Sequence, residues 1–450
     1  MSPLWSLFQV ASQVGGEILG EGSVVPSSLS LDTRTLQPGA CFVALRAERD
    51  GHGFAAQAVE KGAAALLVDH PLEVGCPQLV VPDTLAALQK WGQARLAAVR
   101  PSQVCGVTGS VGKTSTKELL AAALGGWKTP GNRNNTLGLP EALATLPEGL
   151  DSAVLELGMS TPGEIRRLTE LAPLDAGLIT LVGTAHIENF RKSQQGIAEA
   201  KGELVAGLNR GGLWVHLASD PWCRWIAAQP WAQHAEALAV GEGEAFGWEG
   251  VESLGAAGEA FQLRTPQGAV PIRLQLPGEH QVRNAALAAT LAIRLGHGAG
   301  KVAEGLGRVA PEPGRGRLHV LPGGGCLLDE AYNASSDSIL ACARALLGLP
   351  GGEAVAVLGS MRELGPEAAR IHEETGRALR ALGLGRLWAY GDHAGDYALG
   401  FGPGARAFPD FETLRDAAEG LSAIPPGARI LVKGSRFWRA ERAVEWLLAH

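Results

Sequence analysis

The sequence predicts an α/β protein of three domains: a small N-terminal α/β domain, a central α/β domain built on a phosphate-binding loop of the P-loop ATPase kind, and a C-terminal, Rossmann-like doubly wound domain. Three observations support this. The chain has 450 residues, strand-like apolar runs alternate with helix-forming stretches, and a glycine-rich loop ending in Gly-Lys-Thr lies at residues 106–116. Changes of pattern near residue 83 and at the Pro-Glu-Pro-Gly segment 311–314 divide the chain into residues 1–82, 83–310 and 311–450.

Composition narrows the class of protein. Hydrophobic residues make up 46% and charged residues 19%, as in ordinary globular domains, and the net charge of −7 gives no basic face for nucleic acid. The six cysteines lie far apart without a C-x-x-C pair, which is typical of free thiols in a reducing compartment. The N-terminus resembles no signal peptide, and no apolar run reaches the roughly 18 residues of a membrane span. We therefore expect a cytoplasmic protein without a membrane span.

The first domain, residues 1–82, alternates short strands and helices. Strands are expected at 41–45 and 63–68, with a helix at 54–62 between them. Two polar turns could contact an anionic ligand, although most such residues are solvated loop polars; they hold Asp32, Thr33, Arg34 and His52.

The sequence GVTGSVGKTST, residues 106–116, predicts a nucleoside triphosphate site. A strand at 103–107 precedes the loop, and a helix at 117–124 follows it. Glycine lets the backbone N–H groups turn toward a phosphate, and the helix N-terminus adds partial positive charge. Lys113 would reach the terminal phosphates, and the Thr114 hydroxyl would bind Mg²⁺. The alternative is a plain strand–turn–helix with a surface lysine. The expected nucleotide contacts in the loop are Gly109, Ser110, Gly112, Lys113, Thr114 and Ser115.

Two further strands of the central domain end in residues suited to metal binding. Glu156 ends the strand expected at 153–157, and His186 follows the strand expected at 177–182. Ligands in open α/β sheets collect at the carboxyl ends of strands, where a carboxylate is a natural Mg²⁺ ligand. A lone histidine at such a place is more often structural. The remaining elements are helices at 84–99, 197–208 and 284–295, a strand at 214–217, a hairpin at 261–276 and an asparagine-rich turn at 129–140.

The third domain alternates strands and helices cleanly, which predicts a doubly wound sheet. No G-x-G-x-x-G follows its first strand, so a nicotinamide cofactor is not indicated. With two linkers, the domains are expected to form clefts that open and close. Strands are expected at 326–328, 354–358, 386–390 and 429–432, and helices at 336–347, 366–382, 412–421 and 439–448.

Several segments of the chain, spread over nearly its whole length, match those of a known family in the same order. They are TGSVGKT, TPGNRNNTLGLP, LELGMSTPGEI, GTAHIENF, AKGEL, GEHQVRNAALAA, DEAYNASSDS, VLGSMRELG and LVKGSR. In these segments the chain resembles the Mur ligases, ATP-dependent amide-forming enzymes of peptidoglycan synthesis. The asparagine-rich turn, YNAS and KGSR favour the branch that adds D-alanyl-D-alanine to a UDP-N-acetylmuramoyl-tripeptide.

The resemblance implies ATP and two Mg²⁺ ions as cofactors and a monomer without a nucleic-acid partner. Lys113, Glu156, His186 and Lys201 would be catalytic; Thr114 and Glu156 would bind the first Mg²⁺, and His186 and a carbamylated Lys201 the second. Asn284 would lie near adenine, Arg317 would reach across to the phosphates, and Glu330 would contact the ribose. Asp32, Thr33, Arg34 and His52 would hold the UDP sugar. The other implied substrate contacts are Asn134, Asn135, Tyr332, Asn333, Lys433, Ser435 and Arg436.

The implied reaction activates the tripeptide carboxylate as an acyl phosphate, which the amine of the dipeptide then attacks. Three alternatives remain open at this level. They are a Mur-like ligase that adds another amine, such as a relative of folylpolyglutamate synthase, a phosphotransferase, and a nucleotide-gated binding module without turnover.

Overall fold

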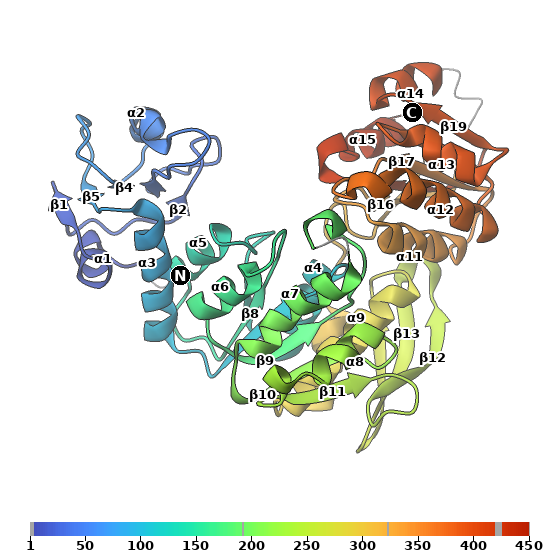
Figure 1. Ribbon diagram of the computed structural model, residues 1–450, viewed down its shortest axis with the longest axis horizontal. Helices are drawn as coiled ribbons and strands as arrows, with labels where there is room; N and C mark the ends of the chain where they lie inside the picture. The colour runs from blue at the N-terminus through green and yellow to red at the C-terminus, as the bar shows by residue number, and fades with distance from the viewer. Residues whose placement is uncertain (1–3, 191–192, 322–323, 419–424, 450) are drawn as a thin grey trace.

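The computed structural model describes residues 4–190, 193–321, 324–418 and 425–449. Four sheets follow one another along the described part of the chain, three large and one small. Figure 1 shows the N-terminal sheet on the left, the large central sheet below and the C-terminal sheet at the upper right. The three-part α/β architecture expected from the sequence is confirmed. In this described part of the chain, no helix is both long and apolar enough to cross a membrane.

The N-terminal sheet has five strands in the order β1-β5-β4-β3-β2, and only β1 runs antiparallel to its neighbour. Strands β3 and β4 are buried on both faces because apolar side chains point to either side, such as Leu67 toward α1 and Leu66 toward α2. The helix expected at 54–62 begins instead with a 3₁₀ turn. The elements are α1 (Leu7–Val14), β1 (Glu17–Leu19), β2 (Leu29–Ser30), β3 (Cys41–Val43), η1 (Gly51–Phe54), α2 (Ala55–Glu60), β4 (Ala65–Val68) and β5 (Gln78–Val80).

Helix α3 (Thr84–Val99) joins the first sheet to the second, and its predicted bounds are confirmed. Asp83 caps it by accepting a hydrogen bond from the backbone N–H of Ala86. Trp91 packs into the N-terminal core. A Cβ at Gly92 would lie 2.8 Å from the carbonyl oxygen of Pro140, so α3 and α5 (Gly138–Ala144) approach closely there. One helix thus packs in the cores of both domains.

The central sheet is all parallel, in the order β11-β10-β9-β6-β8-β7. Strand β6 lies between β9 and β8, so the loop after it opens in the middle of the sheet. Helix α4 begins at Lys113, four residues before the predicted start, because the loop lysine already has helical geometry. The elements are β6 (Gln103–Thr108), α4 (Lys113–Leu124), β7 (Trp127–Lys128), α5 (Gly138–Ala144), β8 (Ser152–Glu156), α6 (Glu164–Leu171), β9 (Leu174–Ile179), η2 (Ile187–Asn189), α7 (Gln194–Ala206), β10 (Leu208–Leu217), α8 (Pro221–Ala227), η3 (Pro230–Ala232) and β11 (Glu236–Val240).

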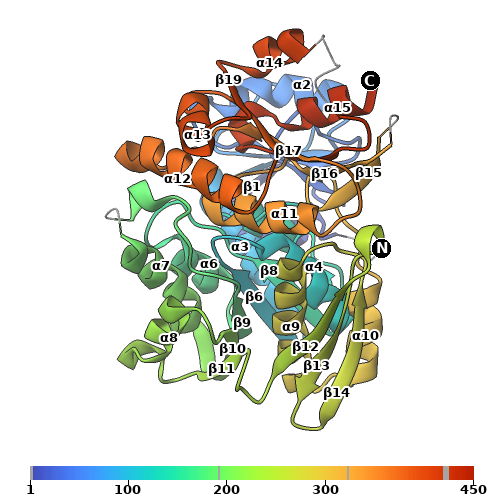
Figure 2. The same cartoon turned by 90° about the vertical axis from the view of Figure 1, so that its right-hand side faces the viewer.

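A small antiparallel sheet, β12-β13-β14, completes the central region and contains the predicted hairpin. Alternate side chains of the hairpin, such as Phe261 and Ile272, pack in the same core as α4 and α9. Figure 2 shows this sheet beside α9 and α10. The elements are β12 (Gly247–Ser253), η4 (Gly255–Ala257), β13 (Glu259–Thr265), β14 (Gly268–Leu274), α9 (Glu279–Arg294) and α10 (Ala299–Gly307).

The C-terminal sheet has the order β15-β16-β20-β17-β18-β19, parallel except for β15. Helices α11, α12 and α13 cover one face, and α14 and α15 cover the other, which confirms the doubly wound prediction. The end of the helix expected at 412–421 lies outside the described residues. The elements are β15 (Arg317–Val320), β16 (Cys326–Glu330), α11 (Ser336–Leu347), β17 (Ala354–Gly359), η5 (Gly365–Glu367), α12 (Ala368–Ala381), β18 (Arg386–Tyr390), α13 (Ala394–Phe401), β19 (Ala405–Phe408), α14 (Phe411–Ala418), β20 (Arg429–Lys433), η7 (Arg436–Trp438) and α15 (Glu441–Ala449).

Candidate active site

A cleft of about 840 Å³ lies between the central and C-terminal sheets. One wall is formed by the segments after β6, β8 and β9 and by the start of α9. The opposite wall is formed by the segments after β16, β17 and β20. Both walls therefore consist of carboxyl ends of parallel strands, where α/β sheets bind their ligands.

The phosphate-binding loop is shaped by two glycines that could not be replaced without displacing a neighbour. A Cβ at Gly109 would lie 1.8 Å from the hydroxyl of Thr180, and a Cβ at Gly112, which has φ +84°, would lie 2.9 Å from Oδ1 of Asn284. The Lys113 ammonium donates a hydrogen bond to the carbonyl of Gly109 at 2.8 Å. Burial lowers the pKa of Lys113, and the negative charge of Glu156 opposes this shift.

Glu156 ends β8 beside this loop with its side chain almost fully buried, at 1% exposure. Its Oε1 accepts a hydrogen bond from Nδ2 of Asn134 at 2.8 Å. Its Oε2 is buried and accepts no hydrogen bond from the described residues, and the Lys117 ammonium is 3.6 Å away. A buried carboxylate oxygen without a hydrogen bond, in a cleft that the Thr114 hydroxyl also lines, is suited to a hard cation.

His186 follows β9 with a positive φ of 63° and lies on the central wall of the cleft. Its Nδ1 pairs with the carboxylate of Glu363, which follows β17 on the opposite wall and has φ +62°. The His186 contact lowers the pKa of Glu363. This ion pair joins the two walls.

Lys201 is buried on α7 at 3% exposure and is not among the residues that line the cleft. This burial excludes a solvated helix lysine that pairs with Glu199 or Glu203. Glu203 accepts hydrogen bonds from the backbone N–H groups of Gly163 and Arg166 instead. Burial, followed by the positive charge of Lys113, lowers the pKa of Lys201 far below its ordinary value. The physical setting favours a neutral amine.

The predicted nucleotide contacts divide into those that line the cleft and those that do not. Asn284 and Glu330 line it, whereas Arg317 is exposed at the start of β15 and does not. Arg315 lines the cleft instead, with its guanidinium 3.9 Å from the centre of the Tyr332 ring. Its positive charge also acts on the Lys113 and Lys117 ammonium groups. Arg315 is thus the linker arginine that the structure brings to the phosphate loop.

Every substrate contact predicted in the central and C-terminal domains lines the cleft. Asn134 and Asn135 come from the asparagine-rich turn, and the others come from the segments after β16 and β20. The buried hydroxyl of Ser435 has no hydrogen-bond partner among the described residues, which leaves it available to a ligand. The others are Tyr332, Asn333, Lys433 and Arg436.

The predicted substrate contacts of the N-terminal domain lie outside this cleft. Arg34 is exposed and forms a two-pronged ion pair with the Asp32 carboxylate. That contact lowers the pKa of Asp32. The Thr33 hydroxyl donates to Oε1 of Gln57, and the Thr33 carbonyl accepts from the Lys61 ammonium. The exposed Arg34 remains accessible to a ligand.

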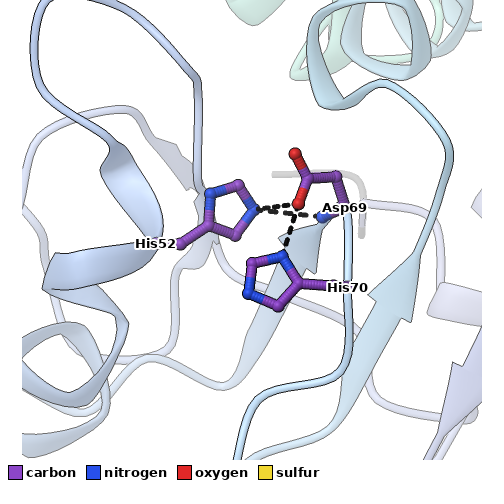
Figure 3. Close-up of side chains that lie close together, drawn as sticks. All are labelled: His52, Asp69 and His70. Atoms are coloured by element: carbon purple, nitrogen blue, oxygen red, sulfur yellow. Dashed lines mark hydrogen bonds and ion pairs between the residues drawn. The ribbon is translucent and has the colours of Figure 1, made fainter.

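His52 does not fit its predicted role as a direct ligand contact. Its ring is buried, Nδ1 lies 2.6 Å from the Asp50 carboxylate, and Nε2 accepts the backbone N–H of Asp69 at 3.0 Å. Figure 3 shows His52, Asp69 and His70 drawn together, with Nε2 of His52 directed at Asp69. Because the Nε2 lone pair accepts this N–H, we assign His52 to holding its turn against β4 rather than to binding a ligand or metal.

A second cluster of metal-ligand types, His280, Glu330 and Cys342, lies within the cleft. The Glu330 carboxylate is already balanced by the Lys433 ammonium at 3.4 Å. Burial raises the pKa of the Cys342 thiol and lowers that of His280. A neutral thiol beside an ammonium group is poorly suited to a cation, so this cluster fits nucleotide contacts better than a metal.

Sequence reasoning missed contacts between the two walls. Burial raises the pKa of Asp337 on α11, and the backbone N–H of Thr184 opposes this shift. A Cβ at Gly183 would lie 2.4 Å from Oδ2 of Asp337, so a side chain there would displace this carboxylate where the walls meet. Glu363 and Arg315 were also missed. None of these residues has a local signal, because their partners lie in another domain.

Family models and individual relatives agree on the family to which the chain is similar. Residues 107–292 match the Mur ligase middle domain, and residues 316–436 match the Mur ligase, glutamate ligase domain. A protein of Escherichia coli (strain K12) named UDP-N-acetylmuramoyl-tripeptide--D-alanyl-D-alanine ligase is 36% identical, and the alignment covers 98% of each chain. A protein of the same name from Bacillus subtilis (strain 168) is 33% identical, with 93% of each chain covered.

Solved structures show the same relationship. A crystal structure of MurF from Acinetobacter baumannii has a TM-score of 0.87 and 31% identity, with all of both chains covered. The MurF ligase from Thermotoga maritima, solved in complex with ADP, has a TM-score of 0.79 and 27% identity, with 94% of this chain and 97% of that chain covered.

Proposed function

The chain belongs to the Mur ligase family, and on that premise we propose that it is an ATP-dependent ligase that adds D-alanyl-D-alanine to UDP-N-acetylmuramoyl-tripeptide in peptidoglycan synthesis. The observation that supports this most is the composition of the two walls of the cleft. The phosphate loop and Glu156 lie on the central wall, and the Tyr332-Asn333 and Lys433–Arg436 segments lie on the other. A carboxylate, a triphosphate and an amine can therefore meet in one cleft.

The need for ATP follows from the low reactivity of a free carboxylate, whose leaving group in an attack by an amine would be oxide. Oxide cannot be expelled by an amine at neutral pH, so the tripeptide carboxylate first attacks the γ-phosphorus of ATP and ADP leaves. The amine of the dipeptide then attacks the acyl carbon of the acyl phosphate, and the tetrahedral intermediate expels phosphate. Lys113 balances charge on the transferring phosphoryl group, and the walls of the cleft orient both reactants.

The residues present fit magnesium. The buried, unbonded Oε2 of Glu156 and the hydroxyl of Thr114 are hard oxygen donors near the loop that would hold the phosphates. We propose that these two hold one ion, and that His186 and a carbamylated Lys201 hold a second. Bound there, magnesium would neutralise negative charge on the phosphates. His186 would have to leave Glu363 to take this role.

We propose a ligand-binding role for each domain. Residues 1–82 would bind the UDP sugar through the Asp32-Thr33-Arg34 turn, where Arg34 is exposed. Residues 83–310 would bind ATP and magnesium. Residues 311–450 would bind the incoming dipeptide and part of the nucleotide, with Glu330 at the ribose and Arg315 rather than Arg317 near the phosphates.

We further propose a cytoplasmic enzyme that works as a monomer and binds no nucleic acid. All six cysteines are free thiols, as expected in a reducing compartment. Residues from a single chain form both walls of the cleft, so a second copy is not needed to complete it.

Phosphate release should require both organic substrates. With purified protein, ATP and magnesium, phosphate should appear only when UDP-N-acetylmuramoyl-tripeptide and D-alanyl-D-alanine are both present, and mass spectrometry should show the pentapeptide product. Replacing the dipeptide by D-glutamate or L-lysine serves as the control and should give neither phosphate nor product.

The same assay separates the alternatives. Phosphorylated tripeptide that accumulates without phosphate release would indicate a stable phosphate ester and hence a phosphotransferase. Nucleotide binding without turnover under any substrate combination would indicate a binding module. Product from glutamate but not from the dipeptide would indicate a ligase of another branch.

A further inference from the structure

Lys117 is a lysine with 0% exposure, which is rare because burying an ammonium group is costly unless it is paired. It lies on α4, one helical turn after Lys113 and Thr114. The side chain does not line the cleft, and the ligation chemistry does not use it. Its burial therefore needs another explanation.

The contacts of Lys117 provide one. Its ammonium donates a hydrogen bond to the carbonyl of Gly131 at 2.8 Å, lies 3.4 Å from the carboxylate of Glu118, and lies 3.6 Å from Oε2 of Glu156. Gly131 belongs to the asparagine-rich turn, and Glu156 ends β8. One ammonium group thus connects the phosphate-loop helix, the turn and the carboxylate.

Glu156 is held on its other side by the same turn. Asn134 donates from Nδ2 to Oε1 of Glu156 at 2.8 Å, and its carbonyl accepts the backbone N–H of Gly158 at 2.7 Å. The hydroxyl of Thr129 accepts the backbone N–H of Glu156 at 3.0 Å. Lys117 and Asn134 therefore hold the two carboxylate oxygens from two directions.

We propose that Lys117 is a positioning residue: it fixes the Glu156 carboxylate and the asparagine-rich turn to the phosphate-loop helix, so that the divalent-cation ligand and the turn keep one geometry. This rests on the proposed role of Glu156 in metal binding. Removing one partner of a buried ion pair leaves an uncompensated charge, which would allow Glu156 to turn away from the cation. Groups that orient a metal ligand typically change metal affinity by 10–100-fold.

The test measures cation binding without turnover. Mn²⁺ binding to the full-length protein with ADP, but without either organic substrate, can be followed by electron paramagnetic resonance. Lys117→Met removes the charge and keeps the length, and we expect it to weaken Mn²⁺ binding at least about 10-fold. ADP binding in EDTA should be unchanged, because Lys117 does not line the cleft.

Lys128→Met is the matched control. Lys128 pairs with the same Glu118 from the solvent side, its side chain is 44% exposed, and it forms no ion pair with Glu156 in the described part of the chain. It should bind Mn²⁺ like the unmodified protein. Lys117→Gln, which keeps a donor for Gly131 but no charge, is a second variant with less change to the packing, and it should also weaken Mn²⁺ binding.

Unchanged Mn²⁺ affinity in a folded Lys117 variant would overturn the proposal. Failure of both Lys117 variants to fold would overturn it as well, because the contacts would then serve the stability of the central domain. Since neither organic substrate is present, weakened Mn²⁺ binding would support the role of Lys117 even if the protein proved to ligate another acid or amine.

Discussion

Replacing Lys113 by alanine is expected to lower kcat/KM for ligation by about 10²–10³-fold, the cost of removing one electrostatic donor from a transferring group. In the structure the ammonium bonds to the Gly109 carbonyl within the loop, at 2.8 Å. A γ-phosphate bound in the loop would present a stronger, charged acceptor. The variant loses this charge where negative charge moves during phosphoryl transfer.

Steady-state phosphate release with both organic substrates measures the effect. Lys301→Ala is the control, because Lys301 is an exposed lysine of α10 outside the cleft, and it should behave like the unmodified enzyme. Near-normal ligation by a folded Lys113→Ala protein would contradict the assignment of the loop to phosphate binding.

Replacing Lys201 by alanine should remove most of the activity, and short carboxylates such as acetate should restore part of it. Lys201 is buried, and both burial and the charge of Lys113 lower its pKa, so the amine is held neutral. A neutral amine reacts with CO₂ to form a carbamate and releases a proton. The resulting carboxylate is a hard oxygen ligand suited to Mg²⁺.

Two measurements check this. Activity of the alanine variant is titrated with acetate, and the unmodified enzyme is incubated with ¹³C-bicarbonate and examined by ¹³C NMR for a carbamate signal that is absent from the variant. Full activity of Lys201→Ala, or only a free amine under CO₂-replete conditions, would show that Lys201 is structural.

The buried parallel strands could be predicted because their sequences have strong local signals. Runs such as those in β6 and β17 are short, apolar and bounded by glycine or polar residues, and the structure places both inside sheets. Helix α3 has its predicted bounds, and an aspartate cap begins it. Local chemistry defined these elements.

Elements at the edges of the sheets could not be predicted in the same way. Strand β15 is mostly exposed and is defined by its antiparallel pairing with β16 rather than by an apolar pattern. Strand β19 lies at the opposite edge of the C-terminal sheet, helix α13 precedes it, and both are short. Their assignment depends on neighbours in the folded sheet, which a single strand or helix pattern does not contain.

In the candidate site, too, residues with a local signal could be predicted, and residues placed by contacts between domains could not. The phosphate loop, Glu156 and the asparagine-rich turn lie on one domain and could be predicted from motif and strand position. Glu363, Asp337 and the choice of Arg315 over Arg317 depend on how the C-terminal domain sits on the central one. The role of His52 could not be predicted either, because it depends on a contact with Asp69, which directly follows β4.

The central claim is that this cleft activates a carboxylate as an acyl phosphate before an amine attacks it. The most direct test uses UDP-N-acetylmuramoyl-tripeptide with ¹⁸O in its terminal carboxylate, together with ATP, magnesium and D-alanyl-D-alanine. If the acyl phosphate forms, one carboxylate oxygen becomes the bridging oxygen and leaves with phosphate, so mass spectrometry should find one ¹⁸O in each phosphate released. Product formation with unlabelled phosphate would contradict the account.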